Sequence, residues 1–277
     1  MKKFNLWASM IALFLCVGFA SCGDDDDNNA DNAGPGNVIP TDIKKVVSIR
    51  NSYETIKFTY ANGKLASVEE EDSKYAFAYS GNTVTITCTY SYDPSDKDVY
   101  TMNVGSNGFL KDGTAVSTET YNGETYTSTA HVSFSYDKEG HLTAINTNSK
   151  DSEGDEYTSK TEFIWENGNI TKTIESWREK TEGGEDSGKS TRISTYSKEE
   201  NTACISFFDE VADLDELEYV YYAGLLGKST KNLLKSMKSI SEDGSENYVT
   251  NYSYKLDSDN YPTTVTIDNQ DNFYTYK

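Results

Sequence analysis

The chain has 277 residues, of which 45 are acidic and 25 are basic, so its formal net charge at pH 7 is −20. Nucleic acid and anionic lipid surfaces are poor partners for a protein of this charge. About 235 residues follow the N-terminal segments described next, enough for one substantial hydrophobic core or two small ones, and no second linker divides them.

Residues 1–21 have the features of a secretory signal peptide. Two lysines precede an uninterrupted apolar run from Leu6 to Phe19, and two small residues then lead to Cys22. This order of charge, apolar run and small residues is that of an export signal. The run is shorter than the about 20 apolar residues of a membrane-spanning helix, and aspartates follow it at Asp24 to Asp27. We therefore expect the segment to be removed and not to span a membrane.

The sequence Phe19-Ala-Ser-Cys resembles the lipobox of bacterial lipoproteins. The resemblance implies that the chain is cut before Cys22 and that the Cys22 thiol is acylated, although Phe19 stands where leucine is commoner. Ordinary signal cleavage with an unmodified Cys22 is the alternative. Several acyl chains anchor a protein durably, whereas a single chain holds it only marginally. We therefore predict that covalently attached lipid anchors the protein to a membrane and that the chain does not cross it.

Residues 22–40 are rich in Asp, Asn, Gly and Pro, and a segment with so few apolar residues is expected to be a flexible tether. The aspartates after Cys22 resemble the export signal that sends lipoproteins of Bacteroides-like bacteria to the outer face of the outer membrane. Aspartates that only keep the tether solvated are the alternative. The expected location is the outer membrane, with exposure at the cell surface favoured over the periplasmic face.

Residues 41–277 are expected to form a single all-β domain. Apolar and polar residues alternate along most of this length, as in strands with one buried face. In one such run, Val84, Ile86, Cys88 and Tyr90 share a face while the threonines between them share the other. The 21 Tyr and 11 Phe greatly outnumber the 4 Met, a composition that favours strands over helices.

A loose internal repeat predicts successive β-hairpins. In each copy, two aromatic residues two positions apart end a strand, a turn with Gly or Asn follows, and an apolar strand returns. The two aromatic side chains share one face, and glycine supplies the positive φ of a tight turn. The five copies begin at Phe58, Phe77, Phe134, Phe163 and Tyr252.

Hairpins in succession build an antiparallel meander of about a dozen or more strands, which must curl or close to hide its edges. We predict a closed or nearly closed barrel, or a strongly curled sheet. Residues 213–236 break the alternation, notably at Ala223-Gly-Leu-Leu-Gly and Leu233-Leu. This segment predicts a short helix or a tucked loop that plugs or caps one end of the barrel.

Three stretches carry a resemblance to a known family: Trp165-Glu-Asn-Gly-Asn-Ile-Thr-Lys, Tyr221-Tyr-Ala-Gly-Leu-Leu-Gly-Lys-Ser-Thr-Lys-Asn-Leu and Tyr252-Ser-Tyr-Lys-Leu-Asp-Ser-Asp-Asn-Tyr-Pro-Thr. They resemble a Bacteroides lipoprotein family of unknown function that is described as having a porin-like fold. The resemblance covers roughly residues 41–277 and implies an up-and-down barrel-like domain with no assigned activity and no catalytic residues. The aromatic hairpins are also similar, at irregular spacing, to the tyrosine-aspartate repeats of large bacterial surface shells.

A porin-like fold need not be inserted in a membrane. An outer-membrane barrel presents a continuous apolar band with aromatic girdles to the lipid. This chain has a mean hydropathy of −0.67, Thr and Ser on the alternate faces of its strands, and charges within strands such as Lys57 and Glu162. We expect a soluble barrel with water outside and aromatic side chains inside.

No catalytic site emerges from the sequence. His131 and His141 are the only histidines, and a zinc site would need at least a third converging ligand. Gly227-Lys-Ser-Thr resembles the end of a phosphate-binding loop, but the earlier glycine that this motif needs is replaced by Tyr222. We predict no catalytic residues and no cofactor.

Two further features are weaker candidates. Asp151, Glu153 and Asp155 cluster in one acidic turn and are candidate calcium ligands, although they do not fit the twelve-residue calcium loop. Solvated turn residues are the alternative. Cys88 and Cys204 are the two cysteines of the domain, and an exported protein permits a disulfide between them.

Three functional hypotheses remain, in this order. The first is a surface binding module for a glycan, a lipid or another small ligand. The second is a structural or accessory protein that docks onto a larger outer-membrane complex, and the third is a hydrolase. The candidate ligand-binding residues of the first are aromatic: Trp165, Trp177, Tyr60, Tyr79, Tyr136 and Tyr254.

Overall fold

The computed structural model describes residues 43–277 with the exception of residues 122, 153, 209–217 and 243–246. The predicted signal peptide (residues 1–21) and tether (residues 22–40), with the lipidation candidate Cys22, lie outside the described residues. One short helix and sixteen strands make up the secondary structure of the described residues.

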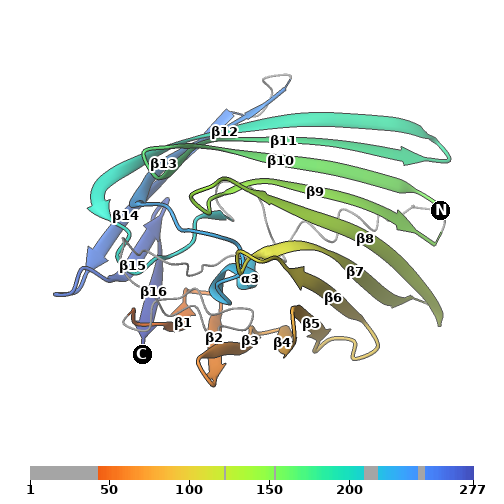
Figure 1. The fold of residues 1–277 in the computed structure, drawn as a ribbon, viewed down its shortest axis with the longest axis horizontal. Coiled ribbons are helices and arrows are strands. Elements are labelled where there is room, and N and C mark those ends of the chain that lie inside the picture. Colours follow the sequence, from red (N-terminus) through yellow and green to blue (C-terminus); the bar gives the residue numbers. More distant parts are fainter. Residues whose placement is uncertain (1–42, 122, 153, 209–217, 243–246) are drawn as a thin grey trace.

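The sixteen strands form one closed antiparallel barrel, so the prediction of an all-β meander that closes on itself is confirmed (Figure 1). Each strand pairs with the next in the chain, and β1 pairs with β16. The strands are β1 (Val46–Arg50), β2 (Thr55–Ala61), β3 (Lys64–Glu69), β4 (Ser73–Ser80), β5 (Thr83–Tyr90), β6 (Lys97–Val104), β7 (Leu110–Tyr121), β8 (Glu124–Tyr136), β9 (Leu142–Asp151), β10 (Glu156–Glu166), β11 (Asn169–Thr181), β12 (Gly184–Glu200), β13 (Asn232–Ser241), β14 (Asn247–Leu256), β15 (Pro262–Ile267) and β16 (Gln270–Tyr276).

The barrel has two different ends, which we call the closed end and the open end. The closed end holds the connections from each even-numbered strand to the next strand, including the predicted turns at Gly63 and Gly168, which have φ values of 79° and 78°. Lys45 and Lys277 also lie there, joined by two backbone hydrogen bonds of 2.9 and 2.8 Å. The open end holds the connections from each odd-numbered strand to the next.

The barrel wall is uneven in height. Strands β7 to β14 have 10 to 17 residues, whereas the remaining strands have 5 to 8. Figure 1 shows β7 to β12 reaching far beyond β1 to β5. Towards the open end, the long strands therefore extend beyond the short strands, and the lumen-facing surface of the long strands has no wall opposite it there.

A plug fills the lumen at the closed end. It is the connection between β12 and β13, residues 201–231, of which 209–217 are not described; it contains the helix α3 (Glu218–Tyr222). Its apolar side chains are almost completely buried and pack on the wall, with Tyr222 against Phe58 at a ring separation of 4.4 Å and Phe208 against Phe163 at 5.4 Å. The predicted interruption at residues 213–236 is thus a plug with a short helix as far as residue 231, whereas Leu233 and Leu234 belong to β13. Its first five residues lie outside the described part of the chain.

Backbone hydrogen bonds fix the plug to the turns of the closed end. Leu110 donates to the carbonyl of Leu225 (2.9 Å), and Lys228 donates to that of Gly140 (3.0 Å). Gly227 lies so close to the same turn that an added Cβ would stand 2.7 Å from the Gly140 carbonyl oxygen. Its φ of +91° is also one that other residues rarely adopt. Gly227 therefore permits the backbone of the plug to touch the barrel wall.

An aromatic residue near the closed end of most even-numbered strands donates a hydrogen bond to a backbone carbonyl of the preceding strand. We call this set the aromatic girdle of the closed end. Its bonds are Tyr79 to Leu65 (2.9 Å), Trp165 to Leu142 (2.7 Å), Tyr196 to Ile170 (3.0 Å), Tyr254 to Leu234 (2.6 Å) and Tyr276 to Pro262 (2.7 Å). The repeat seen in the sequence thus ties neighbouring strands together just below each turn.

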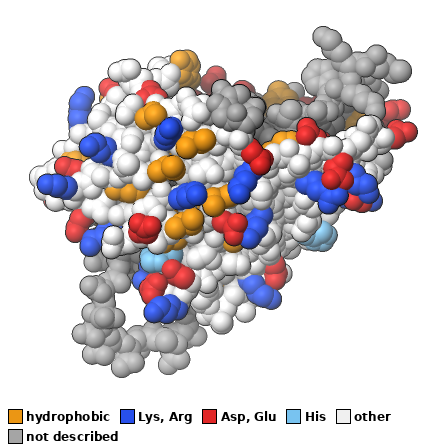
Figure 2. All heavy atoms as spheres, turned by 90° about the horizontal axis from the view of Figure 1, so that it is seen from above, with side chains coloured by type: hydrophobic (Ala, Val, Ile, Leu, Met, Phe, Trp, Pro, Cys, Tyr) orange, Lys and Arg blue, Asp and Glu red, His pale blue; other side chains and the backbone are white. Residues whose placement is uncertain are grey.

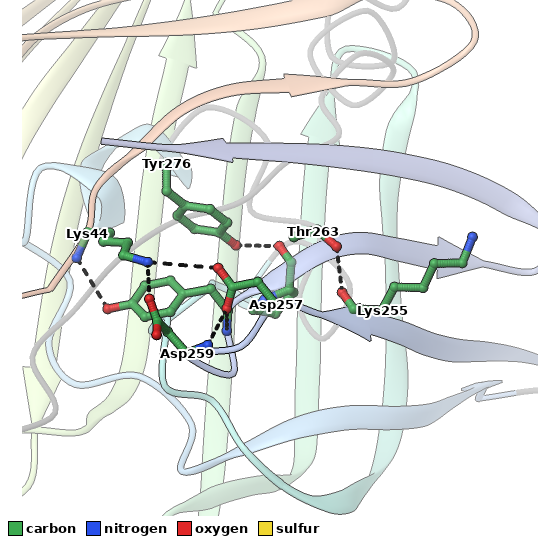
Figure 3. Close-up of polar contacts among 8 residues, drawn as sticks. Lys44, Lys255, Asp257, Asp259, Thr263 and Tyr276 are labelled. Carbon is green, nitrogen blue, oxygen red and sulfur yellow. Dashed lines mark hydrogen bonds and ion pairs between the residues drawn. The ribbon is translucent and has the colours of Figure 1, made fainter.

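Lys44 fastens the beginning of the described chain to the turn between β14 and β15 (Figure 3). Its Nζ lies 2.5 Å from Asp259 Oδ2 and 3.8 Å from Asp257 Oδ2, and its backbone N–H donates to Tyr261 Oη at 3.2 Å. The hydrogen bond to Asp259 is the main reason why the pKa of Lys44 is raised. Such an exposed ion pair stabilises the fold little, but it fixes the place where the preceding chain joins the barrel.

The outer wall carries ion pairs between residues of adjacent or the same strands. Four of them are Lys74–Glu69 (2.5 Å), Lys150–Glu156 (3.0 Å), Lys160–Glu162 (2.6 Å) and Arg178–Glu185 (2.6 Å). Figure 2 shows acidic, basic and hydrophobic side chains intermixed over one face of the molecule. Among the described residues, no helix has the length and apolar character needed to cross a membrane.

Glu70 connects the plug to the sheet at the turn between β3 and β4. Its carboxylate accepts hydrogen bonds from the hydroxyls of Tyr219, in α3, and of Ser73. Burial raises the pKa of Glu70 to about 7, although both hydrogen bonds act to lower it. The side chain therefore holds a proton in the folded protein at pH values where an unfolded chain would have lost it.

We predict that Glu70 makes the domain less stable as the pH rises. Between pH 4.5 and about 7 the folded state keeps the proton and the unfolded state releases it, so stability falls through this range and the loss is complete above it. Glu70→Gln keeps one acceptor oxygen, places an NH2 donor that a hydroxyl can accept at the other position, and removes the titration. The variant should gain on the order of 2 kcal/mol relative to the wild type between pH 4 and pH 8, measured by urea unfolding.

Glu69→Gln is the matched control for Glu70→Gln. Glu69 lies on the outer wall, where the hydrogen bond from Lys74 lowers its pKa. Its stabilising effect is present above its unfolded pKa and is lost as the pH falls, so Glu69→Gln should shift stability in the opposite direction and by less. A Glu70→Gln variant whose stability relative to the wild type is the same at pH 4 and pH 8 would refute the assignment.

Removing one hydroxyl from the aromatic girdle should weaken the barrel measurably. Tyr254→Phe deletes the 2.6 Å bond to the Leu234 carbonyl and leaves that buried acceptor without this donor. We expect the free energy of unfolding in urea to fall by about 1 kcal/mol. Tyr248→Phe, at a side chain that is 49% exposed, is the control and should be neutral. Equal stability of the two variants would mean that the girdle bonds contribute nothing net.

Candidate functional site

The candidate site is the lumen-facing side of strands β9 to β13, which we call the inner wall. Phe163 and Ile145 point into the barrel core, and residues paired directly across strands or two positions along a strand point the same way. The inner wall therefore comprises the polar and aromatic side chains in the cross-strand row of Phe163 and on the neighbouring lumen-facing positions, most of them towards the open end. They are Ser149, Tyr157, Ser159, Thr161, Thr173, Glu175, Trp177, Ser190, Arg192, Ser194 and Ser239.

The change from an apolar to a polar lumen is visible along single strands. On β10, the inward positions read Phe163, Thr161, Ser159 and Tyr157 from the plug towards the open end. The outward positions between them are Glu162 and Lys160, which pair with each other at 2.6 Å. The alternation of period two is kept, but above the plug both faces of the strand are polar.

Three hydroxyls on the inner wall are buried without a hydrogen bond among the described residues. They belong to Ser149, Thr173 and Ser194, whose residues are 7%, 1% and 6% exposed. A buried polar atom without a partner destabilises a fold by about 1–3 kcal/mol, and such atoms in a native protein call for an explanation, such as a ligand or bound water. The hydroxyls are thus candidates for hydrogen bonds to bound water or to a polar ligand.

Arg192 lies between two of these hydroxyls. It is 5% exposed and stands directly across from Thr173 on β11 and from Ser239 on β13, while Ser194 is its inward neighbour on β12. A guanidinium presents several N–H donors in a fixed planar arrangement. The inner wall therefore combines a buried cation with hydroxyl groups that can both donate and accept.

Trp177 lies higher on the inner wall and is half-buried. It is paired with Gly188, where an added Cβ would come within 2.8 Å of the indole atoms Cε2, Cζ2 and Nε1. The indole therefore rests flat against the backbone at Gly188, and no other residue would fit there without a shift. An indole held in this way can serve as a stacking surface for a ligand.

Tyr157 and Glu175 complete the upper part of the inner wall. Burial is the main reason why the pKa of Tyr157 is raised, and the negative charge of Glu175 adds to the effect. Glu175 Oε2 accepts a hydrogen bond of 3.3 Å from the Ser190 hydroxyl. The arrangement offers hydrogen-bond donors, acceptors and an aromatic face, which are the elements of a binding site for a polar small molecule.

Of the aromatic residues predicted to bind a ligand, only Trp177 lies on the inner wall. Tyr79, Trp165 and Tyr254 belong to the aromatic girdle, and the Tyr136 hydroxyl lies 3.4 Å from the Leu225 carbonyl of the plug. Tyr60 lies under the Lys45 ammonium, 4.9 Å from its ring centroid. The structure thus gives these five side chains contacts within the fold at the closed end and leaves Trp177 as the aromatic candidate.

The histidines do not lie together. His131 is exposed on the outer wall, and His141 stacks on Trp165 at 4.4 Å with its Nδ1 2.9 Å from Asp137 Oδ2. Ligand atoms of Asp137, Glu139 and His141 lie within 4.8 Å of one another. Asp137 also accepts the backbone N–H groups of Glu139 and His141, so these contacts equally describe a turn held by its aspartate.

The candidate calcium ligands also lie in a turn that an aspartate closes. Asp151 Oδ1 accepts the backbone N–H of Asp155 at 2.8 Å and so closes the turn between β9 and β10, while Glu153 lies outside the described residues. Calcium binding there stays a prediction. Cys88 and Cys204 are both buried, the first in the wall and the second in the plug, and no disulfide joins them.

The sequence alone does not predict the inner wall, because alternation in strands leads one to expect its Ser and Thr side chains on the outside of the barrel, in water. That expectation holds for β5, whose inward positions are Val84, Ile86 and Cys88. On β10 to β12 the small polar residues face inward instead. The available signal was the run of Thr161, Ser159 and Tyr157 in step with the core residue Phe163.

Comparison with known proteins agrees with this fold. The family described as a domain of unknown function (DUF4595) with porin-like fold matches residues 58–264. A porin-like protein from Bacteroides vulgatus is similar with 15% identity and a TM-score of 0.58, covering 84% of this chain and 99% of its own. One from Bacteroides uniformis has 19% identity and a TM-score of 0.54, covering 85% of this chain and 96% of its own.

No curated protein matches the chain. At these identities the two solved structures establish the fold alone. The family match covers most of the barrel, and the chain therefore belongs to the family of domains of unknown function with a porin-like fold.

Proposed function

We propose that this protein is a lipid-anchored lipoprotein of the outer membrane, exposed at the cell surface, whose barrel is a non-catalytic binding module for a hydroxyl-rich small ligand such as a glycan. The ligand occupies the lumen at the inner wall. The observation that carries the proposal is the set of buried hydroxyls at Ser149, Thr173 and Ser194 that lack a hydrogen bond among the described residues.

The chemistry of the inner wall supports a glycan over a lipid. A sugar supplies donors and acceptors for the hydroxyls and for Arg192, and its C–H face can stack on Trp177. A hydrocarbon chain would leave the hydroxyls of Thr173 and Ser194 buried without partners, a destabilising arrangement. The charge of −20 argues against an anionic lipid surface as the ligand.

The side chains on the outer wall support the proposal that the barrel stays in water. A membrane-inserted barrel presents an apolar band about 25 Å tall to lipid. Here, charged pairs such as Lys160–Glu162 and Lys74–Glu69 stand on outward positions within strands. The lipobox-like sequence at Cys22 supplies a separate route to the membrane.

One observation favours the accessory role as a second candidate. Ile164 and Ile193 are exposed on the outer wall, at 39% and 43%, and both are paired with Lys172 between them. The row Ile164–Lys172–Ile193 presents two exposed apolar side chains, which can contact a partner protein. The row is short, and for this reason the binding module is preferred.

The binding proposal is tested with Thr173→Val, which removes one buried hydroxyl and keeps the shape of the side chain. If Thr173 is kept for a ligand, the variant should be more stable by about 1 kcal/mol without ligand, because a buried polar atom lacking a partner is gone. Its affinity for the ligand should fall. Stability is measured by urea unfolding of the domain 41–277.

Binding is followed by tryptophan fluorescence with a panel of defined hexasaccharides and a fatty acid as probes. Trp165→Phe leaves Trp177 as the single indole of this domain and therefore reports on the inner wall. Thr87→Val, at an outward position of β5, is the control and should change neither stability nor affinity strongly. A less stable Thr173→Val variant, or binding of the fatty acid alone, would contradict the proposal.

The anchor is tested separately with Cys22→Ser in the full-length protein. We expect the wild type in the membrane fraction with incorporated radiolabelled palmitate, and the variant to lose both the label and the membrane association. Cys16→Ser, within the signal peptide, is the control and should keep both. Surface exposure is measured by proteinase K digestion of intact cells. Membrane association of Cys22→Ser would contradict a lipid anchor.

A further inference from the structure

Two adjoining hollows lie on the outer rim of the open end, on the short side of the barrel. The first has a volume of about 390 Å³ and lies between the β1–β2 and β15–β16 turns. The second has about 290 Å³ and lies between the β1–β2 turn and Glu71. Small-molecule sites begin at about 300 Å³. Both hollows are lined by residues 50–53, so the β1–β2 turn forms a ridge between them.

Tyr53 is the prominent side chain of this ridge. It is 74% exposed, the largest exposure among the exposed large hydrophobic residues described. Its backbone is nevertheless fixed, because Asn51 Oδ1 accepts the N–H groups of Tyr53 (2.8 Å) and Glu54 (2.9 Å). A third bond, from the Asn51 N–H to the Glu54 carbonyl, closes the turn at 3.1 Å. The ring is therefore presented to solvent by a turn whose backbone is already ordered.

Polar groups around the first hollow are also held in place. The Arg50 guanidinium lies over the Phe273 ring at 5.1 Å, and Phe273 itself is 39% exposed. Asp271 accepts a hydrogen bond of 2.6 Å from the Thr266 hydroxyl. Arg50 thus keeps its N–H groups near the hollow while its flat face is covered, and Asp271 keeps a second oxygen for another donor.

We propose that this rim binds a neutral pyranose residue of a glycan, with the C–H face of the sugar stacked on Tyr53. A pyranose presents neighbouring hydroxyls on its edge, and planar groups such as Arg50, Gln270 and Asp271 can each contact two of them. Arg50 and Asp271 balance in charge in the first hollow, and Glu54 and Glu71 make the second acidic. The acidic second hollow disfavours uronic acids.

This rim site shares no residue with the inner wall, and its proposal does not depend on a ligand in the lumen. Tyr53, Arg50 and Phe273 lie on the short side of the barrel, on β1, its turn and β16. The inner wall lies inside β9 to β13. A single long glycan could contact both, but each site can be removed by its own substitution.

The test uses saturation-transfer difference NMR of the domain 41–277 with four hexasaccharides, maltohexaose, xylohexaose, mannohexaose and hexagalacturonic acid. At least one neutral hexasaccharide should bind, and Tyr53→Ala should weaken it by about tenfold. Tyr92→Ala is the matched control, because Tyr92 is also highly exposed, at 69%, on a turn of the open end. Thr173→Val reports separately on the inner wall.

Each outcome decides the matter. Loss of binding in Tyr53→Ala with retention in Tyr92→Ala and Thr173→Val supports the rim site. Binding that is lost only in Thr173→Val places the sugar in the lumen and overturns the rim site without harming the proposed function. Equal loss in both tyrosine variants, binding of hexagalacturonic acid alone, or no binding of any of the four sugars also overturns it.

Discussion

The width of the barrel is the constraint on which the rest of the structure depends. Sixteen strands close by backbone hydrogen bonds between β1 and β16, and a ring of this size encloses more space than its own side chains can fill, since about eight strands already give a filled interior. An unfilled apolar lumen would be unstable. The chain meets this constraint in two ways: the described residues of the β12–β13 connection fold inward as a plug at the closed end, and lumen-facing residues towards the open end become polar.

The division between the two halves also explains which residues stabilise the fold and which are free for function. The girdle aromatics, Tyr79, Trp165 and Tyr254 among them, use their donors on backbone carbonyls just where the plug is packed. Trp177 lies nearer the open end, whereas Thr173 pairs with Phe163 and Ser194 with Met237, beside the plug, and the hydroxyls of Thr173 and Ser194 have no hydrogen bond among the described residues. Buried polar atoms of this kind reduce stability, and proteins keep such atoms mainly where a function requires them.

Much of the fold could be predicted from the sequence because its signals are local. Alternation on β5, the paired aromatics before Gly63 and Gly168, and the break near Ala223-Gly-Leu-Leu-Gly each depend on neighbours in the chain. The inner wall could not be found in this way. Whether Thr161 and Ser159 face water outside or the lumen depends on the register set by Phe163 and on the barrel closing around them. The Tyr53 rim is formed by turns more than 200 positions apart in the sequence.

The position of Lys44 and Lys45 has a consequence for orientation. Both lie at the closed end, one fastened to the β14–β15 turn and the other beside Lys277. A chain held to lipid through Cys22 would therefore join the barrel beneath its plug. The plug would then lie between the membrane and the lumen. The open end, with the Tyr53 rim and the mouth of the lumen, would face away from the membrane.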